Sequence, residues 1–233
     1  MRRSDDPGYA LVTGASRGLG EAFAEALARR GSSLILTGRS TEDLERVRRR
    51  VQRPGIEVHC LAADLAGKGA AEVLEALARN GWAVDLLVNN AGLGSVGPFA
   101  ANPLGRELEE VAVNVRAVVE LTHGCLAGMR ARGRGGIIMV SSVAASQPVP
   151  RMATYAASKA FDLRFSLALY AELRAEGIHV MALCPGVTRT NFFPAAGIRP
   201  RGAMHEPEFV VERALRGFER RRAVVVTGAG NRM

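Results

Sequence analysis

The sequence is poor in lysine, cysteine and aromatic residues, and it has no long hydrophobic run. Its three cysteines, Cys60, Cys125 and Cys184, lie in apolar contexts without close partners, which argues against a disulfide framework. Neither they nor the four histidines have metal-ligand spacing, so we expect no metal site. No stretch reaches membrane-spanning length, and the N-terminal residues contain no apolar signal core. We therefore expect a soluble, cytoplasmic protein.

The charge is unbalanced, with 31 basic residues against 23 acidic ones and a formal net charge of +8. Such a charge raises the question of nucleic-acid binding. The basic residues are spread over several expected helices, where clusters such as 46–53 and 220–222 suit exposed faces, and no nucleic-acid motif is present. We expect no nucleic-acid partner, although a basic surface can steer anionic cofactors or acyl substrates toward the protein.

Apolar runs alternate with helical stretches along the chain, a pattern typical of a parallel sheet covered by helices on both faces. The runs begin near Tyr9, Ser33, Glu57, Val84, Gly136, His179 and Ala223. No Pro/Ser-rich linker interrupts the chain, and no segment repeats. Residues 1–233 are therefore expected to form a single α/β domain.

The run Tyr155-Ala-Ala-Ser-Lys159 places a tyrosine four residues before one of only two lysines. On a helix these positions share a face, so the phenol and the ammonium would point into the same space. A neighbouring cation lowers a phenol pKa from about 10, which would make Tyr155 a usable general acid or base. Ser142 could donate a hydrogen bond to a substrate oxygen. The alternative is a structural tyrosine followed by a solvated lysine.

A glycine-rich turn, Thr13 to Gly20, follows the first apolar run and precedes an amphipathic helix. Strand, glycine turn and helix N-terminus in this order form an anion site, because backbone N–H groups and the helix dipole face a phosphate. Glycines alone are weak evidence for a phosphate-binding turn. Residues 227–230 also contain glycines, but we expect only a strand end and a loop there.

In order and spacing, these motifs resemble those of the short-chain dehydrogenase/reductase family over nearly the whole chain. The resemblance is also carried by Asp64-Leu65 after an apolar run, by Asn89 to Gly92 after residues 84–88, by Asn114 in a long helical stretch, and by Pro185 to Thr190. It implies a Rossmann-type doubly wound sheet of about seven parallel strands with helices on both faces.

The resemblance also implies the residues that bind a nicotinamide dinucleotide. They are Gly14, Ser16, Arg17, Gly18, Leu19, Gly20, Arg39, Asp64, Leu65, Asn90, Ala91, Gly92, Tyr155, Lys159, Pro185, Gly186, Thr188 and Thr190. The second apolar run ends at Gly38-Arg39, where an acidic residue would bind the ribose 2′-hydroxyl of NAD. Arg39, helped by Arg17, could instead bind a 2′-phosphate, so we expect NADP(H). The alternative is that Arg39 is a solvated loop residue.

The implied reaction moves a hydride between nicotinamide C4 and a carbonyl or carbinol carbon. By resemblance, Tyr155 is the general acid or base, Ser142 binds the substrate oxygen, Lys159 lowers the Tyr155 pKa and holds the nicotinamide ribose, and Asn114 positions a relay water. Ser141 competes for the serine role, but Ser142 has the family spacing. Two alternatives are a non-catalytic NADP(H)-binding sensor and a lyase, epimerase or dehydratase relative. The intact catalytic set argues against the sensor. The lyase, epimerase and dehydratase relatives are usually longer than this chain, which argues against the second alternative.

The substrate is expected to be a lipophilic ketone, aldehyde or secondary alcohol, because the segments expected to form the pocket carry few charges. These segments, which include a substrate loop near 187–206, supply Val96, Phe99, Val149, Met152, Phe192 and Phe193. The stretches 89–99 and 183–192 resemble those of hydroxysteroid and 3-oxoacyl reductases. Because the chain ends just after the last expected strand, we expect an open pocket or a missing tail.

The helix after Tyr155 is apolar nearly all round, so it needs cover on two sides. Its apolar residues are Phe161, Leu163, Phe165, Leu167, Leu169, Tyr170 and Leu173. The sheet can cover one side. A partner subunit would cover the other, and family members commonly pair through this helix and the one carrying Asn114. A homodimer or homotetramer is therefore expected, with intrachain cover as the alternative.

Overall fold

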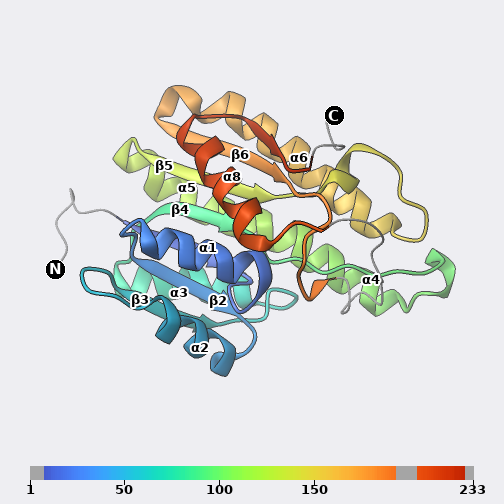
Figure 1. Cartoon of the computed structure of the whole chain (residues 1–233), viewed down its shortest axis with the longest axis horizontal. Helices are drawn as coiled ribbons and strands as arrows, with labels where there is room; N and C mark the ends of the chain where they lie inside the picture. The colour runs from blue at the N-terminus through green and yellow to red at the C-terminus, as the bar shows by residue number, and fades with distance from the viewer. Residues whose placement is uncertain (1–7, 193–203, 229–233) are drawn as a thin grey trace.

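A computed structural model describes residues 8–192 and 204–228, and it contains one seven-stranded parallel sheet between two layers of helices (Figure 1). The strands are β1 (Tyr9–Thr13), β2 (Leu34–Gly38), β3 (Val58–Ala62), β4 (Val84–Asn89), β5 (Gly135–Val140), β6 (Ile178–Cys184) and β7 (Val224–Val226). Their order across the sheet is β3-β2-β1-β4-β5-β6-β7. This confirms the doubly wound α/β fold expected from the sequence.

The helices alternate with the strands along the chain. They are α1 (Gly18–Arg29), α2 (Thr41–Val51), α3 (Gly69–Asn80), α4 (Leu104–Val111), α5 (Ala117–Arg132), α6 (Ala153–Leu173) and α8 (Pro207–Glu219). The π-helical turn η2 (Ala112–Arg116) joins α4 to α5, and short 3₁₀ turns lie at η1 (Phe99–Ala101), η3 (Val143–Ser146) and η4 (Arg174–Glu176). No helix in the described ranges is long and apolar enough to cross a membrane.

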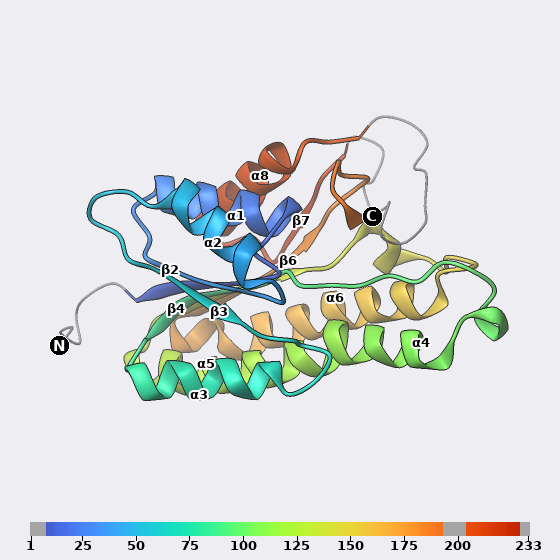
Figure 2. The same cartoon turned by 90° about the horizontal axis from the view of Figure 1, so that it is seen from below.

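The hydrophobic core forms two layers, one on each face of the sheet (Figure 2). Helices α1, α2 and α8 cover one face, and α3, α5 and α6 cover the other. The central strands are buried on both faces, which explains why their sequences are continuous apolar runs and not alternating ones.

The direction of the strand order reverses at β1 and β4, the neighbouring strands at the middle of the sheet. Successive connections leave this point toward opposite edges, so the chain separates there beyond the carboxyl ends of the two strands. In open α/β sheets such a separation is where ligands bind.

Candidate active site

The loops after β1 and β4 are bonded to each other at this switch point. The Thr13 hydroxyl accepts hydrogen bonds from the backbone N–H groups of Asn90 and Ala91, both at 2.9 Å. The Asn90 side chain donates in return to the carbonyls of Thr13 at 2.8 Å and Gly14 at 3.3 Å. These four bonds hold the glycine turn against the Asn90–Gly92 loop.

Glycine is needed in this turn because backbone approaches backbone closely. Gly14 has a φ of +62°, and a Cβ there would lie 2.9 Å from the Ala91 Cα. A Cβ on Gly20, in the first turn of α1, would lie 2.1 Å from the Gly14 carbonyl oxygen. The result is a shallow cradle at the N-terminus of α1, which suits a dinucleotide pyrophosphate.

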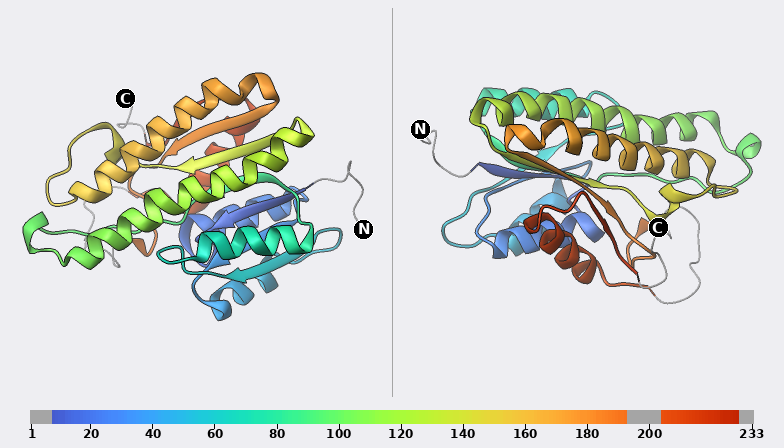
Figure 3. Two further views of the ribbon diagram at one scale, coloured as in Figure 1. Left: turned by 180° about the vertical axis from the view of Figure 1, so that it is seen from behind. Right: turned by 90° about the horizontal axis from the view of Figure 1, so that it is seen from above.

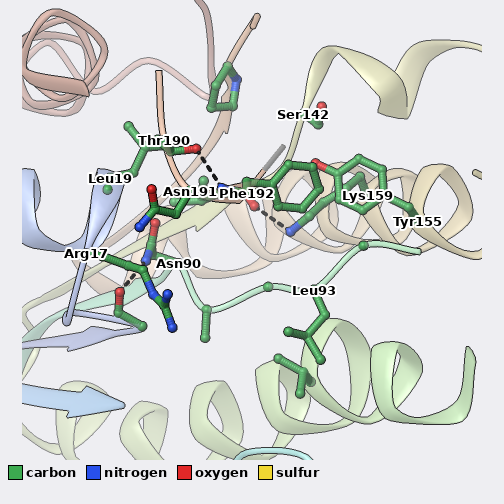
Figure 4. A pocket seen from close by; sticks show the side chains of 18 of the residues that line it. Arg17, Leu19, Asn90, Leu93, Ser142, Tyr155, Lys159, Thr190, Asn191 and Phe192 are labelled. Atoms are coloured by element: carbon green, nitrogen blue, oxygen red, sulfur yellow. Dashed lines mark hydrogen bonds between the residues drawn. The ribbon is translucent and has the colours of Figure 1, made fainter. Parts of the chain in front are cut away.

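The end of β5 and the start of α6 bring Ser142, Tyr155 and Lys159 together (Figure 4). The Ser142 hydroxyl lies near enough to the Tyr155 phenol to lower its pKa, and it accepts a hydrogen bond from the Ala144 N–H at 3.1 Å. The hydroxyl of the competing Ser141 is buried and donates to the Lys159 carbonyl at 2.7 Å. Of the two serines, Ser142 is therefore the one whose hydroxyl influences the tyrosine.

The Lys159 ammonium is buried and held from two sides. Its Nζ donates to the Val140 carbonyl at 2.8 Å and to Asp162 Oδ2 at 2.9 Å. Burial works to lower the pKa of Lys159, but the negative charges of Asp162 and ionised Tyr155 raise it above its ordinary value. Lys159 therefore stays charged beside the phenol.

The net change in the Tyr155 pKa is opposite to the one expected from the sequence. Burial raises the pKa of the Tyr155 phenol, and it outweighs the lowering by the Lys159 charge and by the hydrogen bond with Ser142. Two carboxyl groups, Asp162 and Glu110, raise the pKa further. The expectation that Lys159 brings the pKa down is right about the effect of Lys159 but wrong about the net direction.

Asn114 lies in the π-helical turn η2 and does not line the cleft among the described residues. Its amide Nδ2 donates to the Leu93 carbonyl and to Ser158 Oγ, both at 2.9 Å, and its Oδ1 accepts from the Leu93 N–H at 2.8 Å. The side chain thus fastens the loop after β4 to α6. The relay water expected at Asn114 stays a prediction.

A cleft of about 680 Å³ runs over the carboxyl ends of the central strands. All the residues expected to bind cofactor line it except Gly20, which lies beneath the turn. The lining residues among them are Gly14, Ser16, Arg17, Gly18, Leu19, Arg39, Asp64, Leu65, Asn90, Ala91, Gly92, Tyr155, Lys159, Pro185, Gly186, Thr188 and Thr190. One continuous cleft therefore joins the glycine turn to Tyr155.

The sequence did not point to the residues of α2 and α4 that line the same cleft. Ser40 and Asp43 lie beside Arg39, and Ser40 caps α2 by accepting from the Asp43 N–H at 3.1 Å. From α4, Glu109 comes within 3.8 Å of the Arg39 guanidinium and 2.9 Å of Arg106. An N-cap serine followed by acidic residues was a readable signal for α2, whereas only the tertiary fold brings α4 near Arg39.

The other end of the cleft is apolar and is bordered by Leu93, Val143, Met152 and Phe192. The Phe192 ring lies beside the Tyr155 ring, with 5.0 Å between centroids. Expected wall residues Val96, Phe99 and Val149 are not among the described residues that line the cleft. Phe99 is 61% exposed on η1, because the loop between β4 and α4 extends away from the sheet. Phe193 and most of the expected substrate loop lie outside the described residues.

The parallel sheet and the glycine-lined crevice at its switch point define a doubly wound dinucleotide-binding fold. The family model for short chain dehydrogenases matches residues 8–198. The chain therefore belongs to the short-chain dehydrogenase family.

Relatives with solved structures superpose over nearly the whole chain. A short-chain dehydrogenase from Sphingobium yanoikuyae in complex with NADPH is 33% identical, with a TM-score of 0.89 over 94% of this chain and 87% of its own. A bulky-bulky ketone specific alcohol dehydrogenase from Comamonas testosteroni is 32% identical, with a TM-score of 0.84 over 94% and 86%.

Among curated relatives, hydroxysteroid dehydrogenase-like protein 1 of Gallus gallus is 34% identical over 85% of this chain and 61% of its own length. A very-long-chain 3-oxoacyl-CoA reductase of Anas platyrhynchos is 32% identical over 89% of this chain and 67% of its own. The chain thus spans roughly three fifths to two thirds of the length of these curated relatives.

Proposed function

We propose that the protein is an NADP(H)-dependent oxidoreductase that interconverts a carbonyl and a secondary alcohol. The observation that carries the proposal is the meeting of Ser142, Tyr155 and Lys159 at one end of a cleft whose other end is a phosphate cradle (Figure 4). A dinucleotide long enough to fill the cleft would bring its nicotinamide to these three side chains. A hydride donor or acceptor would then lie beside a proton donor.

Each of the three side chains has a distinct task in this reaction. The bound nicotinamide supplies or takes up the hydride. Ser142 donates a hydrogen bond to the substrate oxygen, and Tyr155 gives that oxygen a proton as negative charge develops on it. Lys159, held by Val140 and Asp162, stabilises the phenolate that remains and binds the nicotinamide ribose.

NADP(H) is proposed over NAD(H) because the residue after β2 is Arg39, and Arg17 of the glycine turn lines the same end of the cleft. A guanidinium binds a 2′-phosphate with charge-assisted hydrogen bonds. Glu109 lies 3.8 Å from Arg39, and this pair at the protein surface is weak enough to exchange for a phosphate. The Sphingobium relative was solved with NADPH, which supports the same choice.

Replacing Arg39 by Asp is expected to lower the preference for NADPH over NADH by roughly tenfold or more, because the charged hydrogen bond is worth about 1.5–3 kcal/mol. The measurement is the dissociation constant of each cofactor by fluorescence titration. Arg49→Asp, on the exposed side of α2, changes the net charge equally and serves as the control. Equal loss of NADPH preference in both variants, or none in either, would contradict the assignment of Arg39.

A lipophilic carbonyl compound or alcohol is the proposed substrate class, because Leu93, Met152 and Phe192 surround the space beside Tyr155. The names of the relatives, which refer to hydroxysteroids, very-long-chain 3-oxoacyl-CoA and bulky ketones, agree with an apolar substrate. The short-chain relative sulfoacetaldehyde reductase, 36% identical over 78% of this chain, acts by its name on a charged substrate and is the reason to test polar compounds too.

The function is tested by following NADPH absorbance with hydrophobic ketones, aldehydes, quinones and 3-oxoacyl thioesters, and with NADH in parallel. Turnover with NADPH and an apolar carbonyl is the expected result. Tight NADPH binding without any consumption across the whole panel would favour the sensor alternative.

A homodimer is also proposed, because the long helix made of α4, η2 and α5 runs beside α6 on the outside of the molecule (Figure 3) and carries four exposed apolar side chains. These side chains are exposed to different extents: Leu104 by 68%, Leu108 by 58%, Val111 by 42% and Val119 by 39%. They recur at helical spacing, which marks one face of the helix. A second copy of the same face would cover them.

Replacing Leu108 by Asp is expected to convert the dimer to a monomer, because a carboxylate would be buried without a partner. Sedimentation velocity of the two proteins is the measurement. Phe209→Asp changes an equally apolar residue, 45% exposed on α8 at the opposite face, and should leave the dimer intact. A Leu108→Asp protein that is folded and still dimeric would exclude this face as the interface.

A further inference from the structure

Asp162 is a buried acid on α6, between the buried Lys159 and Ser166, and the mechanism above gives it no part beyond its contact with Lys159. It is 2% exposed, and its Oδ2 accepts from Lys159 Nζ at 2.9 Å. Its other oxygen, Oδ1, is buried without a hydrogen-bond partner among the described residues. Burying a carboxylate is costly unless it is paired, so its position calls for a role at Lys159.

Two hydrogen bonds fix the position of the Lys159 ammonium. Lys159 Nζ is held at 2.8 Å by the Val140 carbonyl and at 2.9 Å by Asp162, which are contributed by β5 and by the next turn of α6. Gly92 lies on the cleft side of the same ammonium, since a Cβ built there would be 3.5 Å from Nζ. The two bonds therefore leave the rest of the ammonium to face the cleft.

We propose that Asp162 is a positioning residue that holds the Lys159 ammonium and offsets part of its positive charge at the Tyr155 hydroxyl. The inference rests on the proposed function for its consequence in turnover, but the ionisation of Tyr155 can be measured without any substrate. Asp162 itself touches no reacting atom, and it acts through Lys159.

The charges around the phenol determine whether Asp162 raises or lowers the Tyr155 pKa. On α6, Lys159 favours the phenolate and Asp162 disfavours it, while Glu110 of α4 also disfavours it and Ser142 favours it through a hydrogen bond. On β6, the Cys184 thiol stays neutral near pH 7 because burial raises its pKa to about 11. Burial raises the pKa of Asp162 itself, and the charge of Lys159 and its hydrogen bond lower it. In its ionised form Asp162 cancels part of the Lys159 field, so the phenol keeps its proton to higher pH.

A phenol that keeps its proton favours the reductive direction. In reduction the O–H proton of Tyr155 goes to the carbonyl oxygen while the hydride from the reduced nicotinamide goes to the carbonyl carbon. The product is an alcohol, and the phenolate regains a proton from solvent. Oxidation of an alcohol needs the phenolate at the start, so Asp162 would shift oxidation to more alkaline pH.

The test replaces Asp162 by Asn, which keeps the size and a hydrogen-bonding group but removes the charge. The chain has only three tyrosines, so near-ultraviolet phenolate absorbance, with the Tyr155→Phe protein subtracted, reports Tyr155 alone. With and without NADPH, the midpoint in Asp162→Asn is expected at least about one pH unit lower, a tenfold change in the ionisation constant. The acidic limb of the pH profile for alcohol oxidation should also move to lower pH.

Ser166→Ala is the matched control. Ser166 lies one turn further along α6, is fully buried, and its hydroxyl has no hydrogen-bond partner among the described residues. It carries no charge, so the Tyr155 midpoint should not move. An unchanged midpoint in folded Asp162→Asn, or an equal shift in Ser166→Ala, would overturn the inference.

Two further outcomes separate this inference from the proposed function. A lowered midpoint in a protein that reduces no carbonyl would support the role of Asp162 and count against the reaction. Should Asp162→Asn fail to fold, Asp162→Ser, which also removes the charge in a smaller side chain, is titrated in its place: a lowered Tyr155 midpoint would support the inference, and an unchanged one would overturn it.

Discussion

Replacing Tyr155 by Phe is expected to lower turnover by about 10²-fold or more, because a positioned general acid contributes about 10²–10⁴-fold. The ring and its contact with Phe192 are kept, and only the phenol hydroxyl is removed. Tyr155 is the only tyrosine among the described residues that line the cleft, so no second phenol can replace its hydroxyl. The measurement is kcat for NADPH-dependent reduction of the best carbonyl substrate.

The matched control is Tyr170→Phe, four turns further along α6. Tyr170 packs edge-on against His179, with 5.9 Å between centroids, and it does not line the cleft. Both variants should bind NADPH as tightly as the wild type and unfold at nearly the same temperature. A Tyr155→Phe protein that keeps most of its turnover would remove Tyr155 from the proposed mechanism, whichever cofactor is used.

The layers of the fold could be predicted because they depend on short apolar segments. The seven expected strand starts fall within one residue of the observed ones, for instance Ser33 against Leu34 and Gly136 against Gly135. A strand buried on both faces has a continuous apolar sequence, and a helix on the sheet has a periodic one. Neither signal needs information from distant parts of the chain.

Parts of the site that depend on local spacing could be predicted for the same reason. Tyr155 and Lys159 lie on one helix, and the glycine turn is one continuous segment. Contacts between distant segments could not be predicted from one sequence. Glu109 reaches Arg39 only because α4 lies across the cleft from the end of β2.

The pKa of Tyr155 shows the difference most clearly. The sequence places one cation four residues away, and that cation does lower the phenol pKa. The tertiary fold half-buries the ring and brings the Glu110 carboxyl group of α4 near it, and both raise the phenol pKa. Asp162, three residues after Lys159, was readable in the sequence, but its burial beside the ammonium was not.

Replacing Gly20 by Ala is expected to weaken both the fold and NADPH binding, because the new Cβ would meet backbone that is already fixed. The Cβ would lie 2.1 Å from the Gly14 carbonyl oxygen and 2.7 Å from Asn90 Nδ2. The Asn90 amide also bonds Thr13 and Gly14, so the turn cannot move without breaking the bonds between the loops after β1 and β4. Overpacking of this kind typically costs about 1–3 kcal/mol, and a contact this short belongs at the upper end.

If the turn yields, the backbone N–H groups of the cradle move with it, and a loss of about 3 kcal/mol would weaken NADPH binding by roughly 10²-fold. The measurements are thermal unfolding and the NADPH dissociation constant. Gly105→Ala is the control, since α4 offers nothing within 4 Å of a Cβ there and alanine favours a helix. The Gly20→Ala protein could instead be as stable as the control and bind NADPH as tightly. That result would mean that neither the close packing of this turn nor its exact shape holds the cofactor. The cradle would then have to be sought in Arg17, Arg39 and the Asn90–Gly92 loop, whose contacts do not require a glycine at position 20.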